Sequence, residues 1–432
     1  MRALHSNLAR VMLTALLAPA TIASAQNANA SSTATALSGA FTARATGYNA
    51  VNWNPANLAM PGNPGFSFTL LPIDLGAGLR PIDLSHFAPY SGKIIPASVR
   101  EQWMTEVVAD SGQKGNIGFG LTPIAFSMGP FAFQASTKFS SELDLAPDFV
   151  RTILFGNVDS VGSAGPTGKV KNRSFAGTSF RGAAYSTAAL SYGRSLMSLI
   201  PLSNFAGGVT VKYTVGHALA YGLDDGSAID TSKVQVSFPA IVTDPDSANG
   251  IAGAGVGLDL GGAWTIPGFR FGVSVQNVVN TFKWDTTKLK LARATSVFRS
   301  DTSYSQNFDS AYTKAPKVLK DKVVAQKFKP VVAAGVVFDW LPKMSVSFDV
   351  RQQVGDGIEV GPQSSVAAGI ELRAIPFIPL RGGASVFTGG VGVSGGLGLN
   401  LLGFEVGLGG YLRKRGGGSE PGVTLSLVSI NP

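Results

Sequence analysis

The sequence predicts an all-β protein, a transmembrane antiparallel β-barrel that follows an export signal and a short irregular N-terminal segment. Three observations predict this fold. After residue 180 apolar residues alternate with small or polar ones, only 14% of the residues are charged, against roughly 25% in ordinary soluble domains, and 53 of the 432 residues are glycine. No stretch after the signal reaches the ~18 consecutive apolar residues of a membrane-spanning helix. Alternation of this kind is typical of strands with one face toward lipid and the other toward a lumen.

The first 25 residues predict a cleavable signal peptide. Arg2 and Arg10 give a positive start, residues 11–18 are a short apolar run, and Ala23-Ser24-Ala25 matches a cleavage site. The chain contains no cysteine, which excludes disulfides, thiolate nucleophiles and thiolate metal sites. An exported barrel is expected in the cell outer membrane of a diderm bacterium.

The segment between the signal and the first strand, residues 26–64, is predicted as a linker followed by an irregular plug. Residues 27–38 are small and are expected to be loose. The stretch ATGYNAVNWNPANLAMPG, residues 45–62, holds a proline among four asparagines. It is too broken for a helix and too short to be a domain, and irregular backbone is tolerated at membrane depth only inside protein. The alternative is an ordinary surface turn ahead of the first strand.

Residues 65–432 are predicted to form the barrel, with two short amphipathic helices near 98–110 and 145–155. The clearest strand is MSVSFDV, in which Met344, Val346, Phe348 and Val350 face one way while serine and acidic side chains face the other. About sixteen segments have strand character. They lie near residues 66–71, 115–126, 130–139, 183–195, 206–220, 232–243, 251–265, 269–280, 284–297, 329–340, 344–353, 364–374, 380–388, 391–400, 403–413 and 422–430.

Connections between these segments are of two kinds. Residues 266–268, 341–343 and 400–403 are tight turns, whereas residues 140–182, 221–231 and 298–328 are long. Short turns at one rim and long loops at the other are typical of outer-membrane barrels. A soluble β-sandwich also alternates, but the last hundred residues would leave its wet face almost without charge.

Motifs for chemistry are weak. Residues 390–395 spell GxGxxG, but no helix follows them, as a dinucleotide site requires. Only His86 and His217 follow the signal, too few and too separated to predict a metal site or a catalytic triad. Acidic turns at 224–226 and 244–246 are interpreted as ordinary polar loops, with a calcium site as the alternative. We therefore expect no enzyme activity, no catalytic residue, no metal and no cofactor.

The net charge of +9 bears on partners. Because the basic residues are scattered and the chain is exported, nucleic acid is not an expected partner. The one basic run, residues 314–329, has six lysines and one aspartate. It is either a solvated face or a contact for phosphorylated head groups, so outer-membrane lipid and lipopolysaccharide are the expected surroundings.

The stretch ATGYNAVNWNPANLA resembles the N-terminal hatch of the FadL-like outer-membrane transporters, most closely that of an uncharacterised group of bacterial barrels. Asn54, Pro55 and Ala56 match the Asn-Pro-Ala signature of that hatch, and Leu58 is the following apolar residue. The resemblance covers nearly the whole mature chain. It implies a barrel of about fourteen strands (range about 12–16) with the hatch inside the lumen. It further implies that Asn54, Pro55, Ala56 and Leu58, with the neighbouring Trp53, gate the channel.

The function that the resemblance implies is porin-like passive uptake of hydrophobic, fatty-acid-like small molecules, with release past the hatch and lateral exit through the wall. The partners implied are a hydrophobic solute and the barrel-insertion machinery. One departure is the final stretch Ile430-Asn431-Pro432, which lacks the terminal aromatic residue of such barrels. Two alternatives remain: a non-transporting barrel that assists protein secretion or surface attachment, and an exported β-rich soluble protein of the adhesin type.

Overall fold

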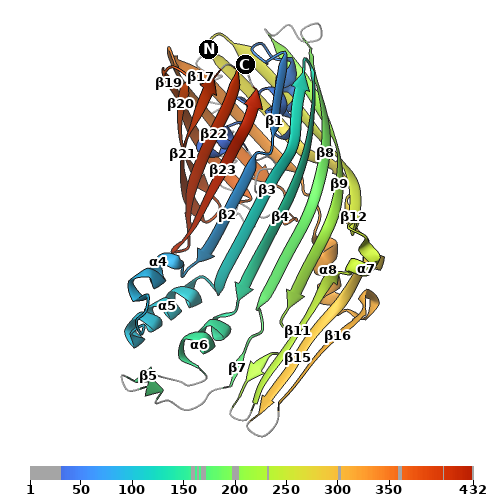
Figure 1. Ribbon diagram of the computed structural model, residues 1–432, viewed down its shortest axis with the longest axis vertical. Coiled ribbons are helices and arrows are strands. Elements are labelled where there is room, and N and C mark those ends of the chain that lie inside the picture. The colour runs from blue at the N-terminus through green and yellow to red at the C-terminus, as the bar shows by residue number, and fades with distance from the viewer. Residues whose placement is uncertain are drawn as a thin grey trace, which may run out of the picture.

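The computed structural model describes residues 31–156, 161–162, 165–166, 172–196, 204–230, 233–299, 303–358, 362–401 and 403–430. Fourteen antiparallel strands close into a barrel (Figure 1). Closure occurs where the last strand pairs with the first, which is split into two pieces. In order around the wall the strands are β1 with β2 (Phe66–Leu70, Ile73–Arg80), β3 (Gln113–Met128), β4 (Phe131–Leu145), β8 (Ser179–Ser195), β9 (Phe205–Leu223), β12 (Gly253–Ile266), β13 (Phe269–Asn280), β17 (Val331–Leu341), β18 (Met344–Gln353), β19 (Ser364–Ile375), β20 (Ile378–Phe387), β21 (Gly390–Leu401), β22 (Phe404–Arg415) and β23 (Gly418–Ile430).

The two rims differ, as predicted. Short turns such as 267–268, 342–343 and 376–377 join strands at one rim, called here the short-turn rim. Most connections at the other, the long-loop rim, carry further elements (Figure 1). These are α4 (Leu84–Phe87), η3 (Ala88–Tyr90) and α5 (Ala97–Ala109) before β3; α6 (Pro147–Phe155), β5 (Val161–Gly162), β6 (Gly165–Pro166) and β7 (Arg173–Ser174) before β8; β10 (Ala228–Ile229), β11 (Lys233–Thr243) and α7 (Pro245–Ala248) before β12; and β14 (Lys283–Trp284), η4 (Thr286–Lys288), β15 (Leu289–Arg299), β16 (Ser303–Ala311), η5 (Tyr312–Lys314) and α8 (Lys317–Ala325) before β17.

Two of the predicted strand segments, 232–243 and 284–297, do not belong to the wall. They form β11 and β15, which pair with each other along their length and extend the sheet beyond the barrel. The extension is attached where β11 pairs with the end of β9. A further strand, β16, lies in the stretch 298–328 that was expected to be a loop. Periodicity of two marks a strand but does not say which sheet the strand joins. Without the segments of β11 and β15, the wall has the fourteen strands that the resemblance implied.

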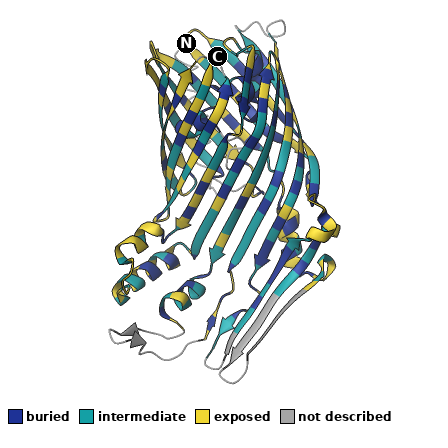
Figure 2. Ribbon diagram, in the orientation of Figure 1, coloured by how far each residue is buried: buried dark blue, intermediate teal, exposed yellow. Residues whose placement is uncertain are grey.

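Burial along the wall strands is inverted relative to a soluble protein (Figure 2). On β18, Phe348 and Val350 are 46% and 47% exposed, whereas Ser347 and Asp349 are buried. Aromatic side chains gather at the short-turn rim, where Phe269 and Trp340 are exposed and the half-buried Trp264 stacks on Phe271 with ring centroids 5.1 Å apart. An apolar outer face edged by aromatic side chains fits a lipid-facing wall. Among the described residues, no helix is long and apolar enough to cross a membrane.

Both expected helices are present, and they pack together at the long-loop rim. The stripe of α5 buries Trp103 and Val107 against Val150 and Phe155 of α6. Pro147 occupies the first turn of α6, and Gly156 ends that helix with a φ of 73°, a conformation that favours glycine. The helix α6 is amphipathic only in part, because its apolar side chain Ile153 is 66% exposed.

Candidate functional site: a segment inside the barrel

Residues 31–64, called the hatch from here on, lie inside the barrel. The hatch consists of α2 (Ser32–Ala36), η1 (Gly47–Asn49), α3 (Ala50–Trp53) and η2 (Pro55–Ala59). The prediction that residues 45–62 are too broken for a helix is therefore wrong, because three short helical turns fit around the proline. These elements contact strands around the circumference: α2 lies against β20 to β23, η1 against β1, β3 and β4, α3 against β4 and β8, and η2 against β8, β9, β12 and β13. Residues 31–38, expected to be loose, instead contain a buried helix that Ser31 caps. The wall therefore encircles the hatch, and the alternative of a surface turn is excluded.

The Asn-Pro-Ala motif forms the contact between the hatch and one side of the wall. Asn54 has an extended backbone and is fully buried. Its Oδ1 accepts from the Ala56 N–H at 3.1 Å, and its Nδ2 donates to the Gly262 carbonyl of β12 at 3.0 Å. Pro55 takes the first position of η2, where its fixed φ suits a helical turn and its missing N–H costs nothing. One amide side chain thus caps the hatch turn and ties it to the wall.

Glycines on the inner face of the wall make room for this motif. A Cβ on Gly261 would lie 2.2 Å from Asn54 Oδ1, and a Cβ on Gly208 would lie 2.3 Å from the Ala56 nitrogen. Real Cβ atoms do not approach other atoms so closely, so the hatch backbone can pack here only against glycine. Further glycines lie under other parts of the hatch: Gly193, Gly272, Gly369, Gly383, Gly396, Gly407 and Gly409. The high glycine content of the chain therefore has a structural reason in the lumen.

The two large apolar side chains of the predicted site, Trp53 and Leu58, make packing contacts rather than hydrogen bonds. Trp53 is 3% exposed and packs edge-to-face on Phe41, with 5.3 Å between ring centroids, inside a small core of the hatch itself. Leu58 is 3% exposed and packs with Val51 against Ala132 and Ala189 of the wall. All five predicted residues are thus buried in one body, but only Asn54 among them hydrogen-bonds to the wall.

Several anchors of the hatch were not predicted from the sequence. The Thr42 N–H donates to both carboxylate oxygens of Asp349 at 3.2 Å. Arg44 pairs with Glu371 at 3.1 Å and donates to Ser345 at 2.5 Å. Arg44 is the one charged residue in the hatch sequence, a signal that could have singled it out. Hydroxyl pairs add to these anchors, with Thr35 and Ser38 lying 2.7 Å from Thr424 and Ser394.

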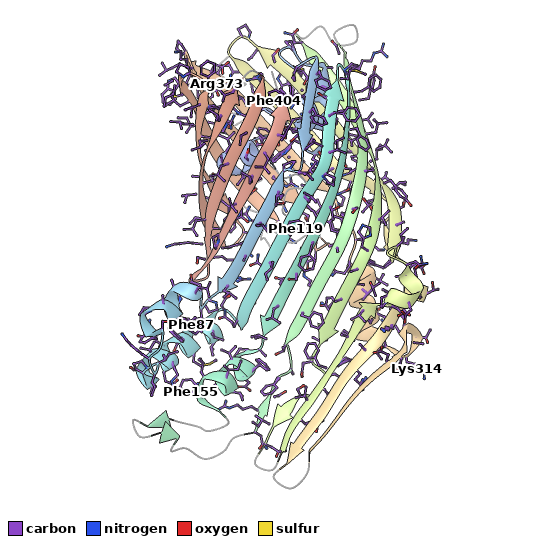
Figure 3. All side chains as sticks on the ribbon, viewed as in Figure 1. Phe87, Phe119, Phe155, Lys314, Arg373 and Phe404 are labelled. Atoms are coloured by element: carbon purple, nitrogen blue, oxygen red, sulfur yellow. The ribbon has the colours of Figure 1, made fainter. Side chains whose placement is uncertain are left out.

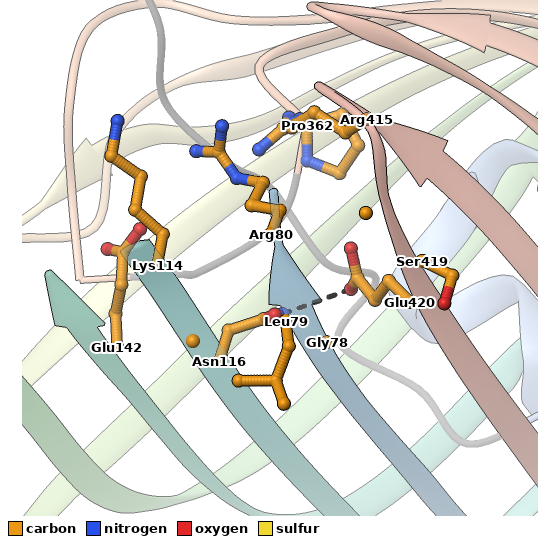
Figure 4. A pocket seen from close by; sticks show the side chains of 12 residues that line it. Gly78, Leu79, Arg80, Lys114, Asn116, Glu142, Pro362, Arg415, Ser419 and Glu420 are labelled. Carbon is orange, nitrogen blue, oxygen red and sulfur yellow. Dashed lines mark hydrogen bonds between the residues drawn. The ribbon is translucent and has the colours of Figure 1, made fainter. Parts of the chain in front are cut away.

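Beyond the hatch the interior is mixed, with an apolar cluster toward the long-loop rim that includes Tyr185 and Leu219, and with charged side chains elsewhere. Lys212 pairs with Asp259 at 2.7 Å and Arg181 with Glu142 at 2.6 Å. Toward the long-loop rim, a pocket is lined by charged side chains, and Asn116 donates to Glu420 there (Figure 4). The small and charged inner positions expected from the alternation are therefore present, and the lumen is not lined by a continuous apolar surface.

The first wall strand is broken next to the hatch, although the Thr122 N–H still donates to the Pro72 carbonyl across the break at 3.0 Å. Leu71 and Pro72 separate β1 from β2, and the pairing of β3 is irregular between Leu121 and Ile124, where Pro123 lies. Pairing with β23 also skips this level. Proline cannot donate to a strand ladder, so two prolines on adjacent strands weaken the wall at one height. The hatch element η1 contacts β1 and β3, and the Tyr48 N–H donates to Ser67 of β1 at 2.8 Å.

The two histidines have local structural contacts. His86 lies 3.0 Å from Asp83 and 3.6 Å from Glu106 in the loop before β3. His217 contacts Ser186 at 2.8 Å and the Gly250 carbonyl at 2.7 Å. In the part of the chain that the structure describes, no group of three metal-ligating residues is present.

The basic run forms η5 and α8 at the long-loop rim (Figure 3 labels Lys314). Leu319 and Val323 of α8 are buried against the inner face of the extended sheet. Lys317 and Lys322 are exposed. The run therefore presents lysines to solvent, and contact with anionic head groups stays a prediction.

Sequence comparison gives the family. Residues 104–320, just over half of the chain, match the family described as "F plasmid transfer operon, TraF, protein". The chain belongs to this family. Comparison with curated proteins gives no match.

Comparison with solved structures gives the fold. The Ralstonia pickettii toluene transporter TbuX is 12% identical with a TM-score of 0.50, covering 94% of this chain and 99% of its own. The Pseudomonas putida toluene transporter TodX is 11% identical with a TM-score of 0.51, covering 95% and 100%. A Pseudomonas aeruginosa FadL homologue is 10% identical with a TM-score of 0.50, covering 95% and 100%. The chain therefore has the fold of the FadL-like barrels, as the Asn-Pro-Ala resemblance implied.

Proposed function

We propose that this protein is an outer-membrane channel for passive uptake of hydrophobic small molecules, and that the hatch gates it. The observation that carries the proposal is a buried hatch, held by hydrogen bonds and small contacts, inside a barrel whose first strand is broken beside it. The similar barrels TbuX and TodX are described as toluene transporters. The exposed apolar belt supports a position in the outer membrane, with export by the predicted signal peptide of residues 1–25.

The anchors of the hatch are suited to a reversible plug. Most of them are single hydrogen bonds, such as those of Asn54 and Ser38 with the wall. Each contributes only about 0.5–1.5 kcal/mol net, so a solute that displaces a few of them can shift the hatch. The interruption at Pro72 and Pro123 offers a lateral exit for a molecule that dissolves in lipid. No covalent step is required of any residue.

A second candidate function is supported by the charged side chains that line the lumen. A transport path for apolar solutes favours an apolar lining, whereas the lumen described above carries ion pairs such as Lys212 with Asp259. A filled polar lumen fits a barrel that acts as a partner in protein secretion or surface attachment, and the family description refers to a plasmid transfer operon.

Uptake in cells tests the first function. A diderm strain that lacks the gene is compared with the same strain complemented by it, using radiolabelled toluene and radiolabelled palmitate as probes. We expect uptake of at least one probe to rise about tenfold, equivalent to about 1.4 kcal/mol off the permeation barrier. Equal uptake of both probes by the two strains, with the barrel present in outer membranes, would contradict the transport proposal and favour the partner role.

A further inference from the structure

The short-turn rim contains a cavity of about 450 Å³ that the hatch and the wall line together. Its charged residues are four arginines and two glutamates: Arg44, Arg270, Arg373, Arg381, Glu371 and Glu405. A second cavity of about 410 Å³ shares Arg44, Arg270, Glu371 and Arg373 with the first and adds the charged side chains of Asp339 and Lys343. Figure 3 shows Arg373 at this rim. The two cavities together are called the arginine vestibule.

The arginines of the vestibule lack enough carboxylate partners. Glu371 alone accepts from Arg44 at 3.1 Å, Arg373 at 2.9 Å and Arg381 at 2.8 Å. Arg381 also reaches Glu405 at 3.2 Å. Arg270 forms no ion pair or hydrogen bond with the described residues, and Arg373 is 69% exposed. The vestibule thus holds four guanidinium groups and the ammonium group of Lys343 against three carboxylates, those of Glu371, Glu405 and Asp339. A guanidinium group binds a carboxylate through two parallel hydrogen bonds when it can.

We propose that the arginine vestibule binds an acidic peptide segment of a partner protein that approaches the short-turn rim. Glu371 already places one carboxylate among three guanidinium groups, which shows that a carboxylate fits between these side chains. The exposed apolar side chains of Ile375 and Phe377 lie at its edge, which favours a segment with alternating acidic and apolar residues. Residues 26–30 of this chain carry no acidic side chain, so they lack the group that the vestibule would bind.

Binding of such a segment also acts on the hatch. Arg44 belongs to the hatch, and Glu371 belongs to β19. A carboxylate that enters between Arg270 and Arg373 competes with Glu371 for the guanidinium of Arg44 and loosens the ion pair that holds the hatch to the wall. This inference goes beyond the proposed function, because binding at the rim does not depend on which solute, if any, the barrel carries.

Peptide binding to the purified full-length protein in detergent tests the proposal. The probe is a fluorescein-labelled Glu-Leu-Glu-Leu-Glu peptide followed by fluorescence anisotropy, with Gln-Leu-Gln-Leu-Gln for comparison. We expect the acidic probe to bind at least tenfold more tightly than the glutamine probe, and the double variant Arg270→Gln with Arg373→Gln to lose that difference. The matched control is Arg194→Gln, an exposed arginine on β8 outside the vestibule. Equal binding of the two probes, or unchanged binding to the double variant, would overturn the proposal.

The release of the hatch is measured separately. Because the chain has no cysteine, Ser38→Cys introduces a single thiol in the hatch, where Ser38 now contacts Ser394. We expect the acidic probe to accelerate maleimide labelling of this thiol several-fold, and Arg44→Gln to accelerate it without the probe. Binding without any change in labelling would overturn the release step. A mobility shift on boiling in detergent gels confirms that every variant is a closed barrel.

Discussion

Cross-linking the hatch to the wall is expected to abolish uptake. In the variant Ser38→Cys with Ser394→Cys, the two sulfurs replace hydroxyls that are 2.7 Å apart, one in the hatch and one on β21. Side chains that face each other at this separation meet the distance requirement of a disulfide, and no native cysteine competes. If the hatch must move for a solute to pass, uptake of the hydrophobic probe in oxidised cells should fall to that of cells without the gene. A reductant should restore it.

A cross-link within the wall is the control. Thr187 and Thr214 lie on β8 and β9 with their hydroxyl oxygens 2.9 Å apart, and neither belongs to the hatch. The variant Thr187→Cys with Thr214→Cys should form a disulfide and transport normally. Undiminished uptake by the fully oxidised hatch cross-link, shown by gel mobility with and without reductant, would mean that the hatch does not gate passage.

A methyl group under the Asn-Pro-Ala motif is expected to open the barrel. The Cβ of Gly261→Ala would lie 2.2 Å from Asn54 Oδ1 and 2.9 Å from Pro55 Cδ. Overpacking of this kind costs about 1–3 kcal/mol, which shifts the equilibrium between the packed and the displaced hatch by about 5-fold to 150-fold. We expect a corresponding rise in ion conductance across planar bilayers and in sensitivity of cells to a large antibiotic.

The adjacent glycine provides a matched control. Gly262 lies on the same strand, and a Cβ there would meet only Val273 Cγ2 at 3.2 Å. Gly262→Ala should therefore leave conductance close to that of the natural sequence. If both alanine variants conduct equally little, the contact between the motif and β12 does not keep the barrel closed.

Much of this structure could be predicted from the sequence, because a lipid-facing wall has a strict alternation. Val346, Phe348 and Val350 alternate with Ser345, Ser347 and Asp349, and the two sets separate to the two faces of β18. The Asn-Pro-Ala motif likewise marked the hatch, through its resemblance to the hatch of the FadL-like transporters.

Other features depend on pairing between distant parts of the chain. The ion pair of Arg44 with Glu371 joins residues 327 positions apart, and alternation does not say which wall residue faces a given hatch residue. The same limit explains why β11 and β15 could not be assigned to the extension. The interruption of the first strand at Leu71 and Pro72 is carried by one local φ of 52° and one proline, too small a signal to separate β1 from β2.

The most direct test of the account is removal of the hatch residues themselves. Deletion of residues 45–60 takes away Asn54, Pro55, Ala56 and their contacts with β12 and leaves all the wall strands intact. The measurement is single-channel conductance, combined with hydrophobic-probe uptake in the same preparation of outer membranes. A plugged channel predicts a large, steady conductance and uptake that no longer discriminates by hydrophobicity. Unchanged conductance and unchanged uptake would contradict gating by the hatch.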